Sequence, residues 1–247
     1  MKGLTKLALA GGLVLGTAPA MATVVYSGYD NNVSGGAMLT SPNADAAQAS
    51  FVSGLQNVLG QSFESYSSGA HPATWTFTGA SGSTTASVTG AGQMMGSYTR
   101  SSPVPNGPFA TDGSKFYTME ASSFTISFAD AVQGLGFYAT DIESDLTATL
   151  LLASGATETY SFDTLFNSSV AGSGSVDYLG FTNAGGIKAL TLSNVGKADA
   201  LGFDQFQIGT LVASVPETTT WGMMIVGMFG AGMMMRARTT RRASLAA

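Results

Sequence analysis

The sequence predicts an all-β fold, an antiparallel β-sandwich of jelly-roll type with one short N-terminal helix. The first observation is an alternation of apolar and polar residues, as at residues 74–78 and 123–128. Residues at this period lie on one face of a strand, so each segment has a buried and a solvated face. The second observation is that clusters rich in Gly, Ser and Asn separate these stretches, as at 79–82, 172–174 and 183–186. Many short strands between such turns are typical of sandwiches.

The predicted elements begin with a strand at residues 23–29. Ser41, Pro42 and Asp45 then mark the start of a helix, since a cap, a first-turn proline and an early acid suit a helix N-terminus. Apolar residues recur at four-residue spacing from residue 47 and continue to residue 59. We therefore expect an amphipathic helix over 41–59.

Beyond the helix the period changes to two, which predicts strands for the rest of the domain. The expected strands lie at 74–78, 85–89, 115–119, 123–128, 135–140, 147–153, 158–162, 176–181, 188–192 and 202–208. The segment 100–113 contains three prolines and is the longest one without strand character. We expect it at the surface.

Composition excludes several classes of function. The 247-residue chain has no cysteine, which excludes disulfides, thiolate metal sites and cysteine nucleophiles. The whole chain has a formal net charge of −5. Residues 23–213 hold 14 of the 15 acidic residues and 4 of the 10 basic ones, which gives this part about −10. Because phosphate binding needs clustered Lys and Arg, we exclude nucleic acid as a partner.

Residues 1–22 have the pattern of a secretory signal peptide. A basic start precedes a short apolar core, and Ala20 and Ala22 provide the small residues of a cleavage site. We expect the mature chain to begin at Thr23, with the secretion machinery as a partner. A retained membrane helix is the alternative, and the short core followed by Pro19 argues against it.

The C-terminal segment 214–242 has the order of a membrane address. We expect a transmembrane helix at 219–235, followed by a basic tail at 236–242 that stays on the cytoplasmic side. The uncharged run at 221–235 would rise about 22 Å as a helix, less than the bilayer core of about 30 Å. The alternative is a buried helix of a soluble domain, but the run has no polar stripe.

This segment resembles the sorting signal of PEP-CTERM exported proteins. The residues that carry the resemblance are Pro216, Glu217, Trp221, Arg236 and Arg238. The family motif is Pro-Glu-Pro, whereas Thr218 follows Glu217 here. The resemblance implies transient anchoring in the membrane and cleavage near the Pro-Glu pair by an exosortase, a transpeptidase-like membrane enzyme.

A looser resemblance covers most of the mature chain. The helix with Phe51 and the segments 62–64, 134–141, 178–181 and 202–206 follow the order seen in exported PEP-CTERM proteins with lectin-like or carbohydrate-binding-module-like sandwiches. Membership of that group implies a role in the cell envelope, at the cell surface or in an extracellular polysaccharide matrix. It also implies polysaccharide as a partner.

Three acids could carry chemistry. Asp141, Glu143 and Asp145 at two-residue spacing would point from one face of a strand. A solvated strand end, a cation site and a glycoside-active pair of carboxylates are the alternatives. The second resemblance also implies a structural calcium held by Glu64 and Asp204, since calcium binds carboxylate and carbonyl oxygens. Solvated strand ends are the alternative there.

Other candidates have simpler interpretations. His71, the sole histidine, lies between Ala70 and Pro72 and is expected in a surface loop. The segment 90–96 is expected to be a turn between strands. Six aromatic residues would stack on sugars only if several gathered on one exposed face, and otherwise belong to the core: Trp75, Tyr98, Tyr117, Tyr138, Tyr160 and Tyr178.

Together these features predict an exported, non-enzymatic protein that requires no cofactor and binds glycan. Two alternatives stay open at this point. One is a secreted glycoside-active enzyme that uses Asp141, Glu143 and Asp145. The other is a purely structural matrix protein.

Overall fold

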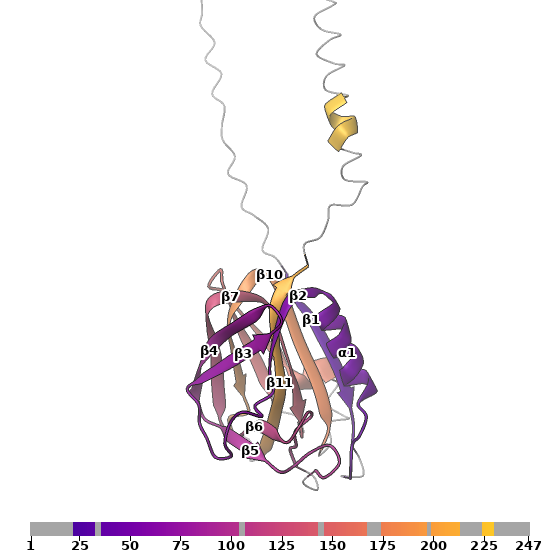
Figure 1. Cartoon of the computed structure of the whole chain (residues 1–247). Helices are drawn as coiled ribbons and strands as arrows, with labels where there is room; N and C mark the ends of the chain where they lie inside the picture. Colours follow the sequence, from indigo (N-terminus) through magenta and orange to yellow (C-terminus); the bar gives the residue numbers. More distant parts are fainter. Residues whose placement is uncertain are drawn as a thin grey trace, which may run out of the picture. The chain divides into compact units, whose positions relative to one another are not determined.

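The structure is a computed structural model that describes residues 22–32, 36–103, 107–142, 146–166, 174–196, 199–212 and 224–229. The chain divides into two units, Met1–Leu211 and Val212–Ala247. The first unit contains the β-domain (Figure 1). In the second unit, residues 224–229 are helical.

Eleven antiparallel strands form one continuous sheet in the described part of the domain. They are β1 (Val24–Asp30), β2 (Leu55–Gln61), β3 (Thr74–Gly79), β4 (Gly82–Gly90), β5 (Gln93–Gly96), β6 (Lys115–Glu120), β7 (Ser123–Thr140), β8 (Thr147–Leu152), β9 (Thr157–Ser161), β10 (Val176–Ser193) and β11 (Ala200–Leu211). Their order is β5-β6-β11-β2-β3-β4-β7-β10-β8-β9, and β1 pairs with β10. Among the described residues of the domain, two helices accompany them, α1 (Pro42–Ser53) and α2 (Phe162–Phe166).

The predicted antiparallel all-β fold is confirmed. Every strand expected from alternation overlaps a strand of the structure. The strands β2 and β5 lie where the sequence predicts the end of a helix and a turn. Alternation is weak in both, because β2 has a run of half-buried residues and β5 is only four residues long.

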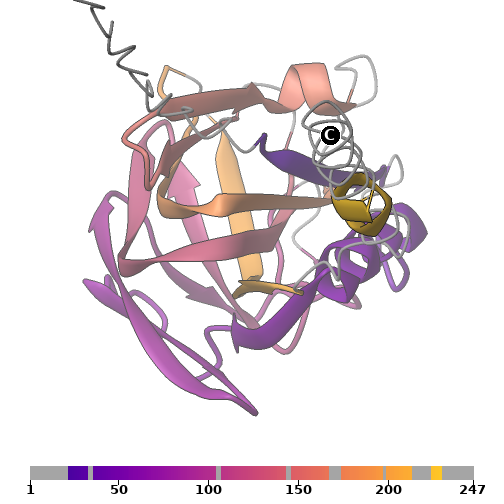
Figure 2. The ribbon, with the colours of Figure 1, turned by 90° about the horizontal axis from the view of Figure 1, so that it is seen from above.

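The long strands β7 and β10 each belong to both halves of the sheet. Residues 123–128 of β7 pair with β4 and with the end of β10, whereas residues 134–140 pair with β11 and with the start of β10. A register shift between Thr182 and Ile187 separates the two halves of β10. Within the described strands, the pairs β11–β2, β2–β3, β3–β4, β4–β7 and β7–β11 close a ring. Figure 2 shows the strands curving around the core.

An aromatic core fills the inside of this curved sheet. Trp75 is fully buried, with its ring 4.7 Å from Phe63 and 5.1 Å from Phe206, measured between centroids. A second apolar cluster lies between α1 and the outer side of the sheet, around Phe51 and Tyr178. Burial of these rings is the main stabilising contribution available to a domain without disulfides.

The helix α1 is shorter than the sequence predicts. It ends at Ser53, and the backbone N–H of Gly54 donates to the carbonyl oxygen of Phe51 at 3.2 Å. Residues 55–61 form β2, which pairs with β11. The expected continuation of the helix to residue 59 is therefore wrong, because pairing with a distant strand outweighs the local apolar spacing.

The start of α1 lies directly against β1. The last residue of β1, Asp30, accepts hydrogen bonds from the backbone N–H groups of Asn43 at 3.0 Å and of Ala44 at 2.8 Å. Its carboxylate thus caps the helix from a neighbouring strand, whereas the side chain of Ser41 makes no cap hydrogen bond. On β1, a side chain at Gly28 would clash with the carbonyl oxygen of Asn43. The close approach of helix and strand therefore requires glycine.

The loop at 100–113 is only partly at the surface. Phe109 and Ala110 are buried, and the backbone N–H of Phe109 donates to Oγ1 of Thr140 at 3.2 Å. The surface prediction is wrong for these residues. Burying the phenylalanine ring stabilises the folded state, although the loop around it is polar.

Candidate functional site

An open groove with a volume of about 800 Å³ lies along the outside of the sheet where β2, β3 and β11 meet. Segments far apart in the sequence form it, namely the β2–β3 connection, β11 and the turn before β6. Its lining is mainly polar and comprises Gly60, Gln61, Ser62, Glu64, Ser65, Tyr66, Thr76, Thr78, Asp112, Gln205, Phe206 and Gln207.

One wall of the groove is held by Gln61, at the end of β2. Its amide nitrogen donates to the carbonyl oxygen of Thr76 on β3, and its amide oxygen accepts from the backbone N–H of Phe63 at 2.7 Å. Phe63 has a φ of 64°, so the chain leaves β2 through a left-handed residue. The amide of Gln61 thereby fixes both the strand pair and the turn beside it.

Tyr66 presents a half-buried ring at the groove. The ring lies 6.3 Å from that of Phe63, between centroids, and the hydroxyl donates to the carbonyl oxygen of Thr74 at 3.2 Å. Because both contacts already restrict the ring in the free protein, a ligand that binds to it loses little further side-chain entropy. A fixed, partly exposed aromatic ring can bind the apolar face of a ligand while its rim stays polar.

The other wall contains Gln205, which follows Asp204 on β11. Gln205 has a φ of 47°, and the pairing of β11 with β7 shifts register between Asp204 and Gln207. Such a bulge changes the direction of a side chain. The amide nitrogen of Gln205 donates to Oγ1 of Thr111 at 2.9 Å.

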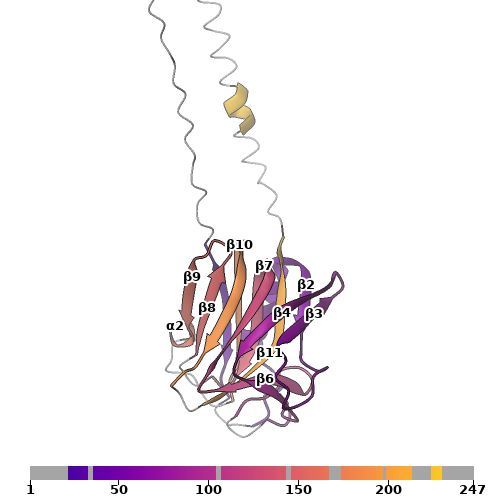
Figure 3. The ribbon, with the colours of Figure 1, turned by 90° about the vertical axis from the view of Figure 1, so that its left-hand side faces the viewer.

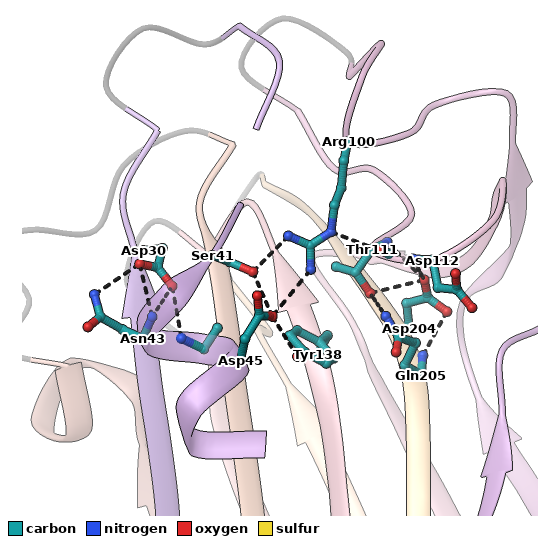
Figure 4. Close-up of polar contacts among 11 residues, drawn as sticks. Asp30, Ser41, Asn43, Asp45, Arg100, Thr111, Asp112, Tyr138, Asp204 and Gln205 are labelled. Atoms are coloured by element: carbon teal, nitrogen blue, oxygen red, sulfur yellow. Dashed lines mark hydrogen bonds and ion pairs between the residues drawn. The ribbon is translucent and has the colours of Figure 1, made fainter. Parts of the chain in front are cut away.

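Two carboxylates hold the turn before β6. Oδ2 of Asp204 accepts from the backbone N–H groups of Thr111 at 2.8 Å and of Asp112 at 3.0 Å (Figure 4). Oε1 of Glu64 accepts from those of Ser114 at 2.9 Å and of Lys115 at 2.7 Å. Asp204 is buried and Glu64 is exposed at the groove.

The predicted calcium pair therefore has protein partners. Within the described residues, no group of three or more His, Cys, Asp or Glu side chains could hold a metal ion. Calcium takes six to eight oxygen ligands. Calcium at Glu64 and Asp204 stays a prediction.

Burial raises the pKa of the Asp204 carboxyl to about 7, although its hydrogen bonds with Asp112, Gln205 and Thr111 act in the opposite direction. Desolvation outweighs the donors, since an ionised carboxylate loses most of its hydration at this depth. Asp204 thus titrates near neutral pH behind the groove.

Of the three acids predicted to share one face of a strand, the structure describes Asp141. The strand β7 ends at Thr140, and Asp141 follows it with a φ of 63°. Its carboxylate is buried and accepts from the backbone N–H of Gly174 at 2.6 Å. The strand prediction is wrong at Asp141, which lines neither the groove nor the second cavity described below. Glu143 and Asp145 lie outside the described residues.

Figure 4 also shows a polar network that sequence reasoning missed. Arg100 donates to Oγ of Ser41 at 2.7 Å and to the carbonyl oxygen of Thr111 at 2.8 Å. Its guanidinium lies 3.8 Å from the carboxylate of Asp45, which also accepts from the hydroxyl of Tyr138 at 2.8 Å. These groups contact one another, so the network joins α1 to the loop at 100–113.

A second cavity of about 590 Å³ lies over β5 and β6, with His71 and Tyr98 among its lining residues. His71 is exposed, as predicted. The predicted aromatic residues do not gather on one exposed face. Trp75, Tyr117, Tyr138 and Tyr178 are all buried, so the core interpretation is confirmed for these four. Tyr66 presents a half-buried ring at the groove, where the ring of Phe206 is fully buried, and no pattern in the sequence around Tyr66 marks it as a site residue.

Most of the predicted processing residues lie outside the described residues, namely Ala20, Pro216, Glu217, Trp221, Arg236 and Arg238. Ala22 is exposed and lies two residues before the start of β1. In the part of the chain that the structure describes, no helix combines the length and apolar character needed to cross a bilayer.

No protein-family model and no curated protein sequence matches the chain. Among solved structures, it is similar to the K2 cleaved adhesin domain of Lys-gingipain (Kgp), with a TM-score of 0.39 and 14% identity over 62% of this chain and 98% of that one. It is also similar to the CBM22-1 xylan-binding domain of Xyn10C from Paenibacillus barcinonensis, with a TM-score of 0.34 and 14% identity over 63% of this chain and 95% of that one. Both scores are too low to support an argument about function.

Proposed function

We propose that this chain is an exported, non-enzymatic protein of the cell surface or extracellular matrix, and that its groove binds a glycan. The observation that carries the glycan proposal is the combination of a fixed ring at Tyr66 with amide and carboxylate groups from three separate segments. The domain is best classed as a lectin-like sandwich, because it has curved, packed antiparallel strands and an open groove.

The chemistry of the groove suits a sugar chain. Sugar rings offer an apolar face for Tyr66 and hydroxyl groups for amides and carboxylates such as those of Gln61, Gln205 and Asp112. An open groove can also accept a polymer that continues beyond the site. The side chain of Gln61 is held by backbone groups and that of Gln205 by the hydroxyl of Thr111, which lowers the entropic cost of binding to them.

The export proposal rests on the two terminal segments. The structure adds one supporting feature at Thr23, the expected first residue of the mature chain. Oγ1 of Thr23 accepts from the amide nitrogen of Asn183 at 2.9 Å, and β1 begins at the next residue. Cleavage after Ala22 would therefore leave the domain intact. Exosortase and the membrane are the proposed partners of the C-terminal signal.

Affinity electrophoresis in gels containing soluble polysaccharides tests the groove. We expect Tyr66→Ala to weaken retardation by about tenfold, or about 1.4 kcal/mol, since the ring is lost. Tyr66→Phe should keep most of the binding, because only the hydroxyl is removed. Tyr98→Ala is the matched control, because Tyr98 is exposed at the second cavity.

Retardation that is identical in the wild type and in Tyr66→Ala would reject the groove as the site. No retardation by any polysaccharide would favour a purely structural matrix protein. The melting temperature of each variant shows whether the domain stays folded. Separately, intact-mass analysis of the native protein should find a chain that begins at Thr23 and lacks the residues after about Glu217.

A further inference from the structure

The outward face of four neighbouring strands carries an array of hydroxyl groups. Figure 3 shows β9, β8, β10 and β7 side by side. We define the hydroxyl grid as the eight positions Ser123, Thr125, Thr191, Ser193, Thr147, Thr149, Thr159 and Ser161. All eight side chains are exposed or half-buried. None is charged and none is aromatic.

Strand pairing aligns these residues in two rows. In the first row, Thr191 is opposite Thr125 on one side and opposite Thr149 on the other, and Thr149 is opposite Thr159. In the second row, Ser193 is opposite Ser123 on one side and opposite Thr147 on the other, and Thr147 is opposite Ser161. The alignment is thus a property of four strands and not of any one segment.

The opposite face of the same strands fixes the grid. Phe124, Ile126, Leu190, Leu192 and Leu150 alternate with grid positions and are buried in the aromatic core. Because side chains alternate along a strand, burial of one set keeps the other set outward. On β9, Tyr160 lies between two grid positions, and its hydroxyl donates a hydrogen bond to the carboxylate of Glu158 at 2.7 Å.

The grid has a regular spacing, and its first row continues onto β4, where the exposed Thr89 is opposite Thr125. Neighbouring strands lie about 4.8 Å apart and alternate residues about 6.7 Å apart, so the hydroxyl groups repeat in two directions. Thr125 and Thr191 are hydrogen-bonded at 2.8 Å, and Thr149 and Thr159 at 3.0 Å. Threonine also has a stiff χ1 angle, which keeps these positions defined. Along β10, the exposed Lys188 lies beyond this uncharged area.

The side chains of the grid argue against a sugar, a protein or an ionic ligand as its partner. It lacks aromatic rings on which a sugar could stack, and it lacks the Trp, Tyr and Arg side chains that dominate protein interfaces. It also has no charge with which to attract an ionic ligand. What remains is a partner that repeats, is uncharged and both donates and accepts hydrogen bonds, as each hydroxyl group does.

Ordered water at the surface of an ice crystal has these properties. We propose that the hydroxyl grid is an ice-binding surface. Each threonine contributes a hydroxyl group that can join the water lattice and a methyl group that can pack against it. This activity is independent of the groove, which lies over β2, β3 and β11.

Partition of the full chain into slowly growing ice tests the proposal. We expect the wild type to be enriched in the ice fraction and to inhibit ice recrystallisation. Thr191→Lys and Thr149→Lys should each reduce the enrichment by about tenfold, because an ammonium group in the grid would have to lose its hydration. Ala49→Lys is the control, because Ala49 is an exposed position on α1 and lies on none of the strands that carry the grid.

A further variant separates misfolding from loss of the site. Thr149→Val keeps the shape of the side chain and removes only the hydroxyl group, and it should also reduce the enrichment while the melting temperature stays near that of the wild type. Exclusion of the wild type from ice would overturn the proposal, as would equal partition of all variants. A concentration-dependent dimer lost in Thr191→Lys would assign the grid to a second copy. Loss of polysaccharide retardation in Thr191→Lys would assign it to glycan.

Discussion

Asp204 should make the stability of this domain depend on pH in a direction unusual for a carboxylate. Its pKa is raised from the ordinary value of 3.8 to about 7 in the folded protein. Between these two values, the folded state retains a proton that the unfolded state releases. The free energy of unfolding should therefore decrease as pH rises from about 4 to about 7, and above that range this contribution becomes constant.

The magnitude follows from the difference in pKa. Each pH unit corresponds to about 1.4 kcal/mol, so Asp204 should contribute a decrease of up to about 4 kcal/mol over this range. Asp204→Asn removes the titrating group and keeps an amide oxygen for the backbone N–H groups of Thr111 and Asp112. The variant should therefore gain stability relative to the wild type as pH rises.

Urea unfolding followed by circular dichroism at several pH values between 4 and 8 provides the assay. The quantity to compare is the difference in free energy of unfolding between variant and wild type. Asp112→Asn is the control, since Asp112 is exposed and its backbone donates to the same carboxylate. Burial also raises the pKa of Asp177, but that contribution is common to all three proteins and cancels. If the Asp204→Asn and wild-type curves ran parallel, the reasoning from burial would be refuted.

Two further predictions concern the contact between β1 and α1. Gly28→Ala should lower the free energy of unfolding by about 1–3 kcal/mol, because its new methyl group would displace the start of α1 at Asn43. Gly54→Ala should change the free energy of unfolding by less than about 0.5 kcal/mol, since the atom nearest to its new methyl group would be 3.6 Å away. Equal losses of stability for Gly28→Ala and Gly54→Ala in urea unfolding would contradict this account. Asp30→Ala should cost about 1–2 kcal/mol through loss of the helix cap at Ala44. Asp30→Asn should lose less in the same assay, and an unchanged midpoint for Asp30→Ala would show that the cap contributes no stability.

Much of the strand content could be predicted because it depends on local pattern. Burial of one strand face leaves a period of two in the sequence, and it is clear in β3, β4 and the first part of β7. The same reasoning failed at β2, where apolar spacing resembled the continuation of a helix. A short strand held by distant partners leaves a weak local signal.

The candidate site was predictable only in fragments. Glu64 and Asp204 were selected from the sequence as calcium ligands, and in the structure both hold the turn at 111–115. Tyr66 was not selected, because nothing in its neighbourhood indicates that β11 lies nearby. The direction of Gln205 depends on a bulge, which is a property of two paired strands.

The antiparallel all-β class, the water-facing threonines and serines and the expectation of export all follow from patterns within short segments of the chain. Which threonine lies beside which, and which polar groups meet at the groove, became apparent only from the folded domain. Alternation and cleavage signals are local in the chain, which is why they can be recognised without the fold. Strand register and the convergence of β2, β3 and β11 depend on contacts between residues far apart in sequence.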